Sequence, residues 1–311
     1  MTTTISAPAG TTPRASSRRG GPFRRLRRRR THLMFLAPAL VLFAAFQIYP
    51  IGRSLILSFQ TREDGVMVWD GVDNYTRLLS DPDFAQALGN TFLILLVQVP
   101  IMLTIALLLA VALRSSFVRF KQGFRLVYFL PAVTALLAYA IVFRTLLNGD
   151  STVLNQFLGF AGIEPINWLG DPFWARVSLI ASVTWRWTGY NMVIFLAGLS
   201  AIDPSLKEAA SIDGANAFQS FRSITVPLLR PVILFALTTS TIGALQLFDE
   251  AYILTKGGPS GATLTIVLYL YRTAFKSLDF GYASAMAYVL VLIVMALAIV
   301  QMRLLRTKDD E

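Results

Sequence analysis

Long runs of residues without any charge divide this chain, and they limit the folds that it can adopt. A helix needs roughly 20 predominantly apolar residues to cross the hydrocarbon core of a bilayer. Several charge-free runs approach or exceed that length. Only 15% of the 311 residues are charged and the mean hydropathy is +0.58, whereas soluble domains have roughly 25% charged residues. The sequence therefore predicts an all-α integral membrane protein.

We predict six transmembrane helices from these runs. The fourth run, residues 177–202, is interrupted only by Arg186. A shorter run at 257–271 begins with GGPSG, and there we expect a loop with a short helix outside the membrane. The six predicted spans cover residues 33–58, 90–113, 125–145, 176–200, 231–254 and 280–303.

The first 30 residues form a distinct segment with nine arginines and no acidic residue. Their Ser, Thr, Gly and Pro content cannot build a core, so we expect a disordered tail (1–30) ahead of a membrane domain (31–311). Nucleic-acid binding is one reading of such a basic run. A twin-arginine export signal at Arg18-Arg19 is another. We favour a cytoplasmic tail that touches anionic lipid, and we expect no nucleic acid as a partner.

The distribution of Lys and Arg predicts that both termini are cytoplasmic. With the tail inside, the cytoplasmic segments hold nine, four, three and three basic residues, 19 of the 28 in the chain. The outer segment 60–87 instead has two basic and six acidic residues. This places the polar stretch 200–230 in the cytoplasm, between spans four and five. The cytoplasmic segments are 1–32, 114–125, 200–230 and 303–311.

Residue types needed for common catalytic and metal sites are scarce. The chain has no cysteine, and His32 is its only histidine. This excludes thiolate chemistry and makes a histidine metal cluster untenable. The chain also lacks the Gly-x4-Gly-Lys-Ser/Thr loop that cradles nucleotide phosphates. We therefore expect neither an enzyme nor a cofactor-binding or metal-binding protein.

The polar stretch after span four reads as two short helices. Asp203 and Pro204 predict a capped helix start, and Gly214 predicts its end. Asn216 is placed to cap a second helix, which carries Phe218 on its apolar side. Helix spacing alone leaves two readings equally open: a helix pair that inserts into the groove of a partner, or a re-entrant or lipid-surface pair.

Sequence motifs decide between these readings. EAASIDG at 208–214, followed by ITVP at 224–227, resembles the EAA signature of permease subunits of bacterial ATP-binding-cassette importers. Val226 replaces the usual Leu of that signature. Further segments are similar to the carbohydrate-uptake branch with maltose-F-like and glycerol-phosphate-A-like permeases. They are Leu130-Pro131, WLGDP at 168–172, DEAYILTKGGP at 249–259 and GYASA at 281–285.

The resemblance implies a set of partners and a coupling role for the loop 200–230. In such importers the loop seats in a cleft of a cytoplasmic ATPase. It implies a second permease subunit, two ATPase subunits that bind ATP and Mg²⁺, an extracytoplasmic solute-binding protein, and the bacterial cytoplasmic membrane as location. The implied ATPase-coupling residues are Glu208, Ala209, Ala210, Asp213, Gly214, Phe218, Ile224 and Pro227.

The resemblance also implies a substrate pathway through spans four and five. Helix packing is the alternative for each residue, because small and hydroxyl residues favour helix contacts in lipid. Arg186 either lines a water-filled cavity, pairs with an acid of the partner permease, or extends to the membrane surface. Asp249 and Glu250 are expected near the outer end of span five, supporting a loop or facing water. The implied pathway residues are Trp185, Arg186, Thr188, Gly189, Met192, Ser240, Ala244, Gln246 and Leu247.

Two other functions remain as alternatives. A self-contained secondary transporter or channel would need intramembrane acids for ion coupling, and spans one, two, three and six contain none. A membrane enzyme would need a catalytic constellation that the residue types above do not provide. The sequence leaves the cargo open between a sugar and a small polyol or glycerol phosphate.

Overall fold

The computed structural model describes residues 34–115, 118–149 and 152–305. The prediction for the basic tail lies outside these residues. The chain divides into two compact units, Met1–Arg53 and Ser54–Glu311.

The described part of the first unit is helical and apolar. It belongs to a continuous helix, Met34–Leu57, that runs on into the second unit and includes η1 (Ala44–Ile48) and α2 (Tyr49–Leu57). All side chains from residue 34 to residue 53 are exposed. A helix that is apolar on every side and exposed is suited to lipid or to a partner helix.

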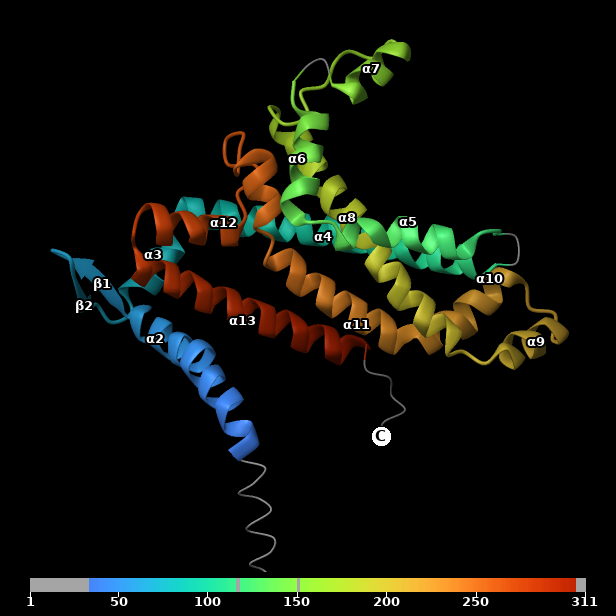
Figure 1. Ribbon diagram of the computed structural model, residues 1–311, viewed down its shortest axis with the longest axis horizontal. Helices are drawn as coiled ribbons and strands as arrows, with labels where there is room; N and C mark the ends of the chain where they lie inside the picture. Colours follow the sequence, from blue (N-terminus) through green and yellow to red (C-terminus); the bar gives the residue numbers. More distant parts are fainter. Residues whose placement is uncertain (1–33, 116–117, 150–151, 306–311) are drawn as a thin grey trace, which may run out of the picture. The chain divides into compact units, whose positions relative to one another are not determined.

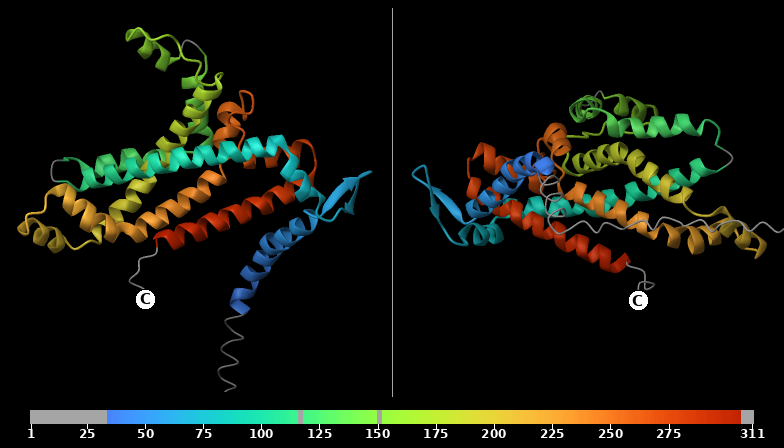
Figure 2. Two further views of the ribbon diagram at one scale, coloured as in Figure 1. Left: turned by 180° about the vertical axis from the view of Figure 1, so that it is seen from behind. Right: turned by 60° about the horizontal axis from the view of Figure 1, so that its bottom comes forward.

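The core of the second unit is built around two long helices, α4 (Pro82–Arg114) and α8 (Pro172–Ser200), which pack along each other. α11 (Val226–Leu245) packs on both, and α13 (Phe280–Leu305) lies beside α11 in Figures 1 and 2. Ala106 and Ala110 of α4 are fully buried. Such small residues let membrane helices approach closely.

The predicted third span is bent rather than straight. α5 (Lys121–Val133) and α6 (Leu136–Leu147) meet at 96°. Thr134 and Ala135 have extended backbone between them, and Pro131 stands in the last turn of α5. Proline removes an amide donor, so the helix ladder is weakest at this point.

Four helices are long and apolar enough to cross a membrane within the described residues, and the bent pair would make a fifth. α8 has 29 residues but is less apolar, since it carries Arg176 and Arg186. The second helix begins at Pro82, earlier than predicted, and α11 ends at Leu245, well before residue 254. The four helices are Met34–Leu57, Pro82–Arg114, Ala217–Leu245 and Phe280–Leu304.

A small antiparallel hairpin departs from the all-α prediction. β1 (Gln60–Glu63) pairs with β2 (Val66–Trp69), with Gln60 opposite Trp69. Asp64 and Gly65 both have positive φ, as a two-residue Asp-Gly hairpin turn requires. The Asp64-Gly65 pair is therefore a hairpin-turn signal that is present in the sequence.

Shorter helices join the long ones. α12 (Ile266–Tyr271) confirms that a short helix lies within 257–271. The remaining elements are α3 (Asp73–Ser80), α7 (Val153–Phe160), α9 (Pro204–Ile212), α10 (Ala217–Ser220), η2 (Phe221–Thr225), η3 (Ala251–Thr255), α12 (Ile266–Tyr271) and η4 (Arg272–Lys276).

Asp81 links three helices, α4, α12 and α13, through its side chain. Its Oδ1 accepts the backbone N–H groups of Asp83 and Phe84 and caps α4. Its Oδ2 accepts the hydroxyls of Tyr269 in α12 (2.6 Å) and Tyr282 in α13 (2.5 Å). One carboxylate thus fixes the start of α4 to two other elements.

Candidate functional site

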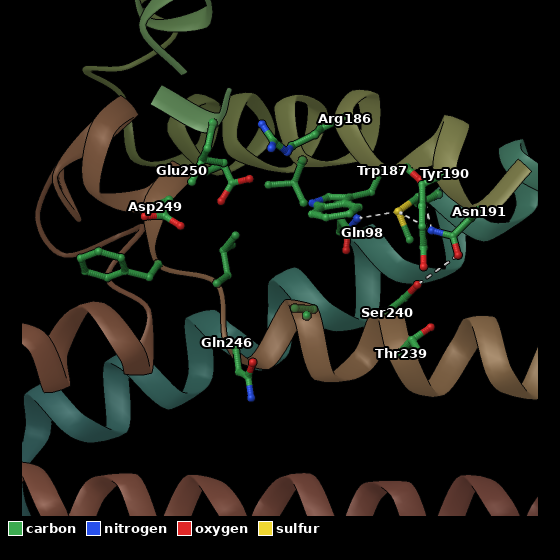
Figure 3. A pocket seen from close by; sticks show the side chains of 17 residues that line it. Gln98, Arg186, Trp187, Tyr190, Asn191, Thr239, Ser240, Gln246, Asp249 and Glu250 are labelled. Carbon is green, nitrogen blue, oxygen red and sulfur yellow. Dashed lines mark hydrogen bonds between the residues drawn. The ribbon is translucent and has the colours of Figure 1, made fainter. Parts of the chain in front are cut away.

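A cavity of about 470 Å³ lies between α4, α8 and α11 (Figure 3). Its volume is within the range of small-molecule sites. Amide, hydroxyl, charged and aromatic side chains meet there. The lining residues are Gln98, Met102, Leu136, Val183, Arg186, Trp187, Tyr190, Asn191, Thr239, Ser240, Gly243, Ala244, Gln246, Leu247, Phe248, Asp249 and Glu250.

One wall of the cavity is an interruption in the predicted fifth span. α11 ends at Leu245, residues 246–248 are not helical, and the helix resumes at Asp249. The Leu247 carbonyl accepts the Thr265 hydroxyl at 2.7 Å. Non-helical backbone at membrane depth is tolerated where it is buried in protein or lines a cavity, because its polar groups need partners. The break therefore marks a polar site.

Arg186 is the buried cation of this cavity, with 6% of its surface exposed. Its Nη2 donates to the Thr134 carbonyl at 3.2 Å, whereas Nε and Nη1 have no hydrogen-bond partner. The guanidinium lies 4.6 Å from the ring centre of Tyr139. The structure places Arg186 on the cavity wall, which favours the first of its three readings, a residue that lines a cavity.

Glu250 supplies a buried carboxylate to the same cavity and is 5% exposed. Its carboxyl group interacts electrostatically with Arg186, and Figure 3 shows the two groups at the same end of the cavity. The reading in which both acids face water fails for Glu250, while Asp249 is exposed. The cavity therefore holds a buried guanidinium and a buried acidic side chain that interact electrostatically.

Weaker polar contacts line the other end. The Ser240 hydroxyl donates to Asn191 Oδ1 at 3.5 Å, and Asn191 Nδ2 donates to the Trp187 carbonyl at 3.1 Å. Trp187 and Tyr190 make an edge-to-face pair with centroids 5.9 Å apart. Aromatic faces beside hydroxyl and amide groups provide both stacking surfaces and hydrogen bonds to a polyhydroxylated ligand.

The cavity brings together five of the predicted pathway residues and leaves out four. Met192 is fully buried in the core, and the Thr188 hydroxyl donates to the Thr184 carbonyl at 2.6 Å. Trp185 packs on Tyr139 and Phe143. A Cβ on Gly189 would lie 1.7 Å from the Tyr128 carbonyl oxygen, so α5 and α8 meet there. The five in the cavity are Arg186, Ser240, Ala244, Gln246 and Leu247.

Gln98 and Met102 on α4 were missed by sequence reasoning, although Gln98 is a polar residue inside a long charge-free run. Its Nε2 contacts the Met102 sulfur at 3.2 Å. Glu250 was noticed, but its burial was not foreseen.

The predicted coupling loop has the helix ends that its sequence indicated. Asp203 caps α9 through the Ser205 amide at 2.9 Å, and Gly214 follows with φ +81°. Asn216 and Gln219 form a reciprocal capping box at the start of α10, with both bonds at 2.8 Å.

Most predicted coupling residues face outward. Phe218 is 68% exposed despite its size, and such exposed apolar groups mark interaction sites when they cluster. Glu208, Ala209, Asp213, Gly214 and Phe218 are exposed, and Ala210, Ile224 and Pro227 are half-buried.

Comparison with known proteins identifies the family. Residues 79–308 match the model described as binding-protein-dependent transport system inner membrane component. The chain belongs to this family. The permease is thus a multi-pass transmembrane subunit of an ATP-driven importer that depends on a binding protein. It is not an enzyme, since ATP hydrolysis lies on a separate subunit.

Relatives match the permease over most of their length. The lactose transport system permease protein LacF of Rhizobium radiobacter is 48% identical over 272 residues, covering 86% of this chain and 91% of that protein. The arabinooligosaccharides transport system permease protein AraP of Bacillus subtilis (strain 168) is 35% identical over 273 residues, covering 87% of each.

A solved structure has the same fold. It is that of a bacterial importer of the acidic polysaccharide alginate, with a TM-score of 0.81, 22% identity, and coverage of 91% of this permease and 98% of that chain.

Proposed function

We propose that the permease carries a neutral sugar of about two or three units through the cavity beside the break in α11. The observation that carries this proposal is the lining: an aromatic pair, amides, hydroxyls, Arg186 and Glu250 around about 470 Å³. Relatives named for lactose and arabinooligosaccharides support a sugar cargo.

An acidic residue beside the one arginine of the lining argues against a phosphorylated or acidic cargo. A second anion beside Glu250 would meet repulsion that cancels the attraction of Arg186. A neutral sugar instead donates hydroxyl hydrogens to the carboxylate and accepts from the free N–H groups of Arg186. A glycerol-phosphate cargo is the less favoured reading for this reason.

The proposal includes six spans, with the bent α5–α6 pair as the third and α8 as the fourth, and both termini in the cytoplasm. Two observations support it: the bias of Lys and Arg and the 29-residue length of α8, which exceeds the roughly 20 residues that a span needs.

The coupling part of the proposal assigns α9 and α10 to the ATPase. We expect them to seat in a cleft of a cytoplasmic subunit that binds ATP and Mg²⁺, while a second permease subunit completes the pathway and an extracytoplasmic solute-binding protein delivers the sugar. The capped ends of both helices and the exposed Phe218 support a rigid docking element.

Uptake into proteoliposomes containing the complete importer tests the cargo. Labelled lactose, an arabinooligosaccharide, an alginate oligosaccharide and glycerol 3-phosphate are each offered with the cognate binding protein. We expect uptake of a neutral sugar alone. Uptake of glycerol 3-phosphate or alginate in place of the neutral sugars would overturn the proposal.

A cavity-filling variant tests the route. Gly243 lines the cavity and has open space around it. Gly243→Leu should abolish uptake while the importer still assembles. Gly123→Leu, on an exposed and uncrowded position of α5, is the size-matched control and should transport normally. Normal uptake by Gly243→Leu would exclude this cavity as the pathway.

A further inference from the structure

A second cavity, of about 390 Å³, lies where α4 and α8 end and the α9–α10 loop begins. It shares no lining residue with the first cavity. Its walls are Val111, Arg114, Ser115, Leu199, Lys207, Ala217, Ser220, Phe221 and Thr225.

This cavity has two cations in its wall and no carboxylate among its lining residues. Arg114 Nη1 donates to the Leu199 carbonyl, which anchors the guanidinium at the end of α8. Lys207 is half-buried, whereas its neighbour Glu208 is exposed, so the lysine turns inward and the acid outward. Within the described parts of the chain neither cation takes part in an ion pair.

The hydroxyl of Thr225 is a second group in the cavity wall that favours a bound ligand. Thr225 is 1% exposed, lies in η2, and its hydroxyl has no hydrogen-bond partner. Buried hydroxyls are nearly always bonded, so an unbonded one on a residue that lines a cavity indicates a missing acceptor or donor. The hydroxyl of Ser220 stands in the same wall.

We propose that this cavity binds a phosphate group, supplied by an anionic phospholipid headgroup or by free phosphate. Arg114 and Lys207 would neutralise its charge, and Thr225 would donate to one of its oxygens. The proposal rests on the cytoplasmic position of α9 and α10 proposed above. Basic pockets between membrane helices on that side bind lipid phosphates.

Electrostatics supports the proposal. Burial and the charge of Arg114 lower the pKa of Lys207, which means that its ammonium form is destabilised in the empty cavity. An anion would relieve both effects. Because the cavity joins the ends of α4 and α8 to α9 and α10, a bound phosphate would brace the base of the coupling loop and raise coupled ATPase activity.

The test uses the complete importer in nanodiscs of phosphatidylcholine alone, of phosphatidylcholine with phosphatidylglycerol, or of phosphatidylcholine with added inorganic phosphate. Native mass spectrometry counts retained phosphatidylglycerol, and ATPase activity is measured with the liganded binding protein. The variants are Lys207→Gln and Thr225→Val. Arg222→Gln removes an exposed cation of the same loop outside the cavity and is the matched control.

We expect retention of the anionic lipid to fall about tenfold or more in Lys207→Gln, as loss of a charge-assisted hydrogen bond predicts, and less in Thr225→Val. Arg222→Gln should resemble the native protein. Stimulation by phosphatidylglycerol alone identifies the lipid, and stimulation by inorganic phosphate identifies the free ion. Equal retention and activity in native protein and Lys207→Gln would overturn the proposal.

Sugar uptake separates this result from the proposed function. Lys207 lies outside the first cavity, so its substitution tests the phosphate site and not the sugar pathway. Native protein that transports no sugar in any lipid would refute the transport proposal. Uptake that is normal but insensitive to phosphate and to anionic lipid would refute the phosphate site alone. Melting curves of both variants serve as the control for folding.

Discussion

At Gly189 the backbones of α5 and α8 approach each other closely. A Cβ there would lie 1.7 Å from the Tyr128 carbonyl oxygen, so the two helices must separate to accept one. We expect Gly189→Ala to destabilise the permease by about 1–3 kcal/mol, the usual range for overpacking. Thermal unfolding in detergent measures this loss. Gly89→Ala, in α4 with open space around it, should leave the melting temperature nearly unchanged.

The carboxylate of Asp81 makes stability depend on pH. Burial raises its pKa, but the bonds from Tyr269 and Tyr282 and from the two capping amides lower it more, so its pKa lies below the ordinary value of 3.8. Its contribution is therefore complete above about pH 4 and is lost as the pH falls through the lower folded-state pKa.

Asp81→Ala tests this dependence. We expect it to melt at a lower temperature than the native permease at pH 7, with a difference that shrinks below about pH 4. Asp83→Ala removes a neighbouring carboxylate that makes no side-chain bond to the tyrosines and serves as the control. A difference that is constant with pH would contradict the assignment.

Arg186 and Glu250 should behave as a coupled pair. Removing one charge leaves the other buried without its counter-charge, which is strongly destabilising. We expect Glu250→Gln and Arg186→Gln each to lose uptake, and the double variant to be more stable than the sum of the single effects by about 0.5–3 kcal/mol. Melting temperatures and sugar uptake of all four proteins measure the coupling. Additive effects would show that the two charges do not interact.

At the level of elements, the sequence predicted helix ends better than it predicted helix breaks. Asp203, Gly214 and Asn216 act through their own side chain or backbone conformation, so local sequence was sufficient. The break at residues 246–248 lies in a run that is charge-free up to Asp249 and depends on distant groups such as the Thr265 hydroxyl. The bend at Thr134 likewise depends on Arg186, which bonds its carbonyl.

The exposed face of α9 should decide ATPase binding. We expect Glu208→Lys to lose the ATPase in a mild-detergent pull-down of the tagged permease while it retains the second permease subunit, because the change reverses a charge on the proposed docking surface. Glu164→Lys makes the same change on an exposed residue of the proposed outer side. It should retain both partners. Loss of neither partner by Glu208→Lys would place the coupling surface elsewhere.

At the scale of the whole molecule, the cavity is lined by residues that are far apart in the chain. Its wall includes Gln98 of α4, Arg186 of α8 and Glu250, which follows α11. Periodicity identifies helices and their polar residues, but it contains no information on which faces meet. This is why Arg186 and Ser240 could be selected from their own segments, whereas the four predicted residues that pack elsewhere could not be distinguished from them.

The path of the chain through the membrane is testable because the protein has no cysteine. Single cysteines at Ser80, Glu164, Ser211 and Ser277 occupy exposed positions between the long helices. With six spans, a membrane-impermeant maleimide should label Ser80→Cys, Glu164→Cys and Ser277→Cys in spheroplasts, and Ser211→Cys only after permeabilisation.

Each competing topology gives a different labelling pattern. If the bent α5–α6 pair were a re-entrant loop, Glu164→Cys and Ser277→Cys would be protected and Ser211→Cys accessible. If α8 did not span, Glu164→Cys and Ser211→Cys would be accessible and Ser277→Cys protected. Ser80→Cys is accessible in all three cases and reports expression. Only the six-span pattern leaves the α9–α10 loop on the side where ATP is available, so this labelling tests the coupling proposal as well as the topology.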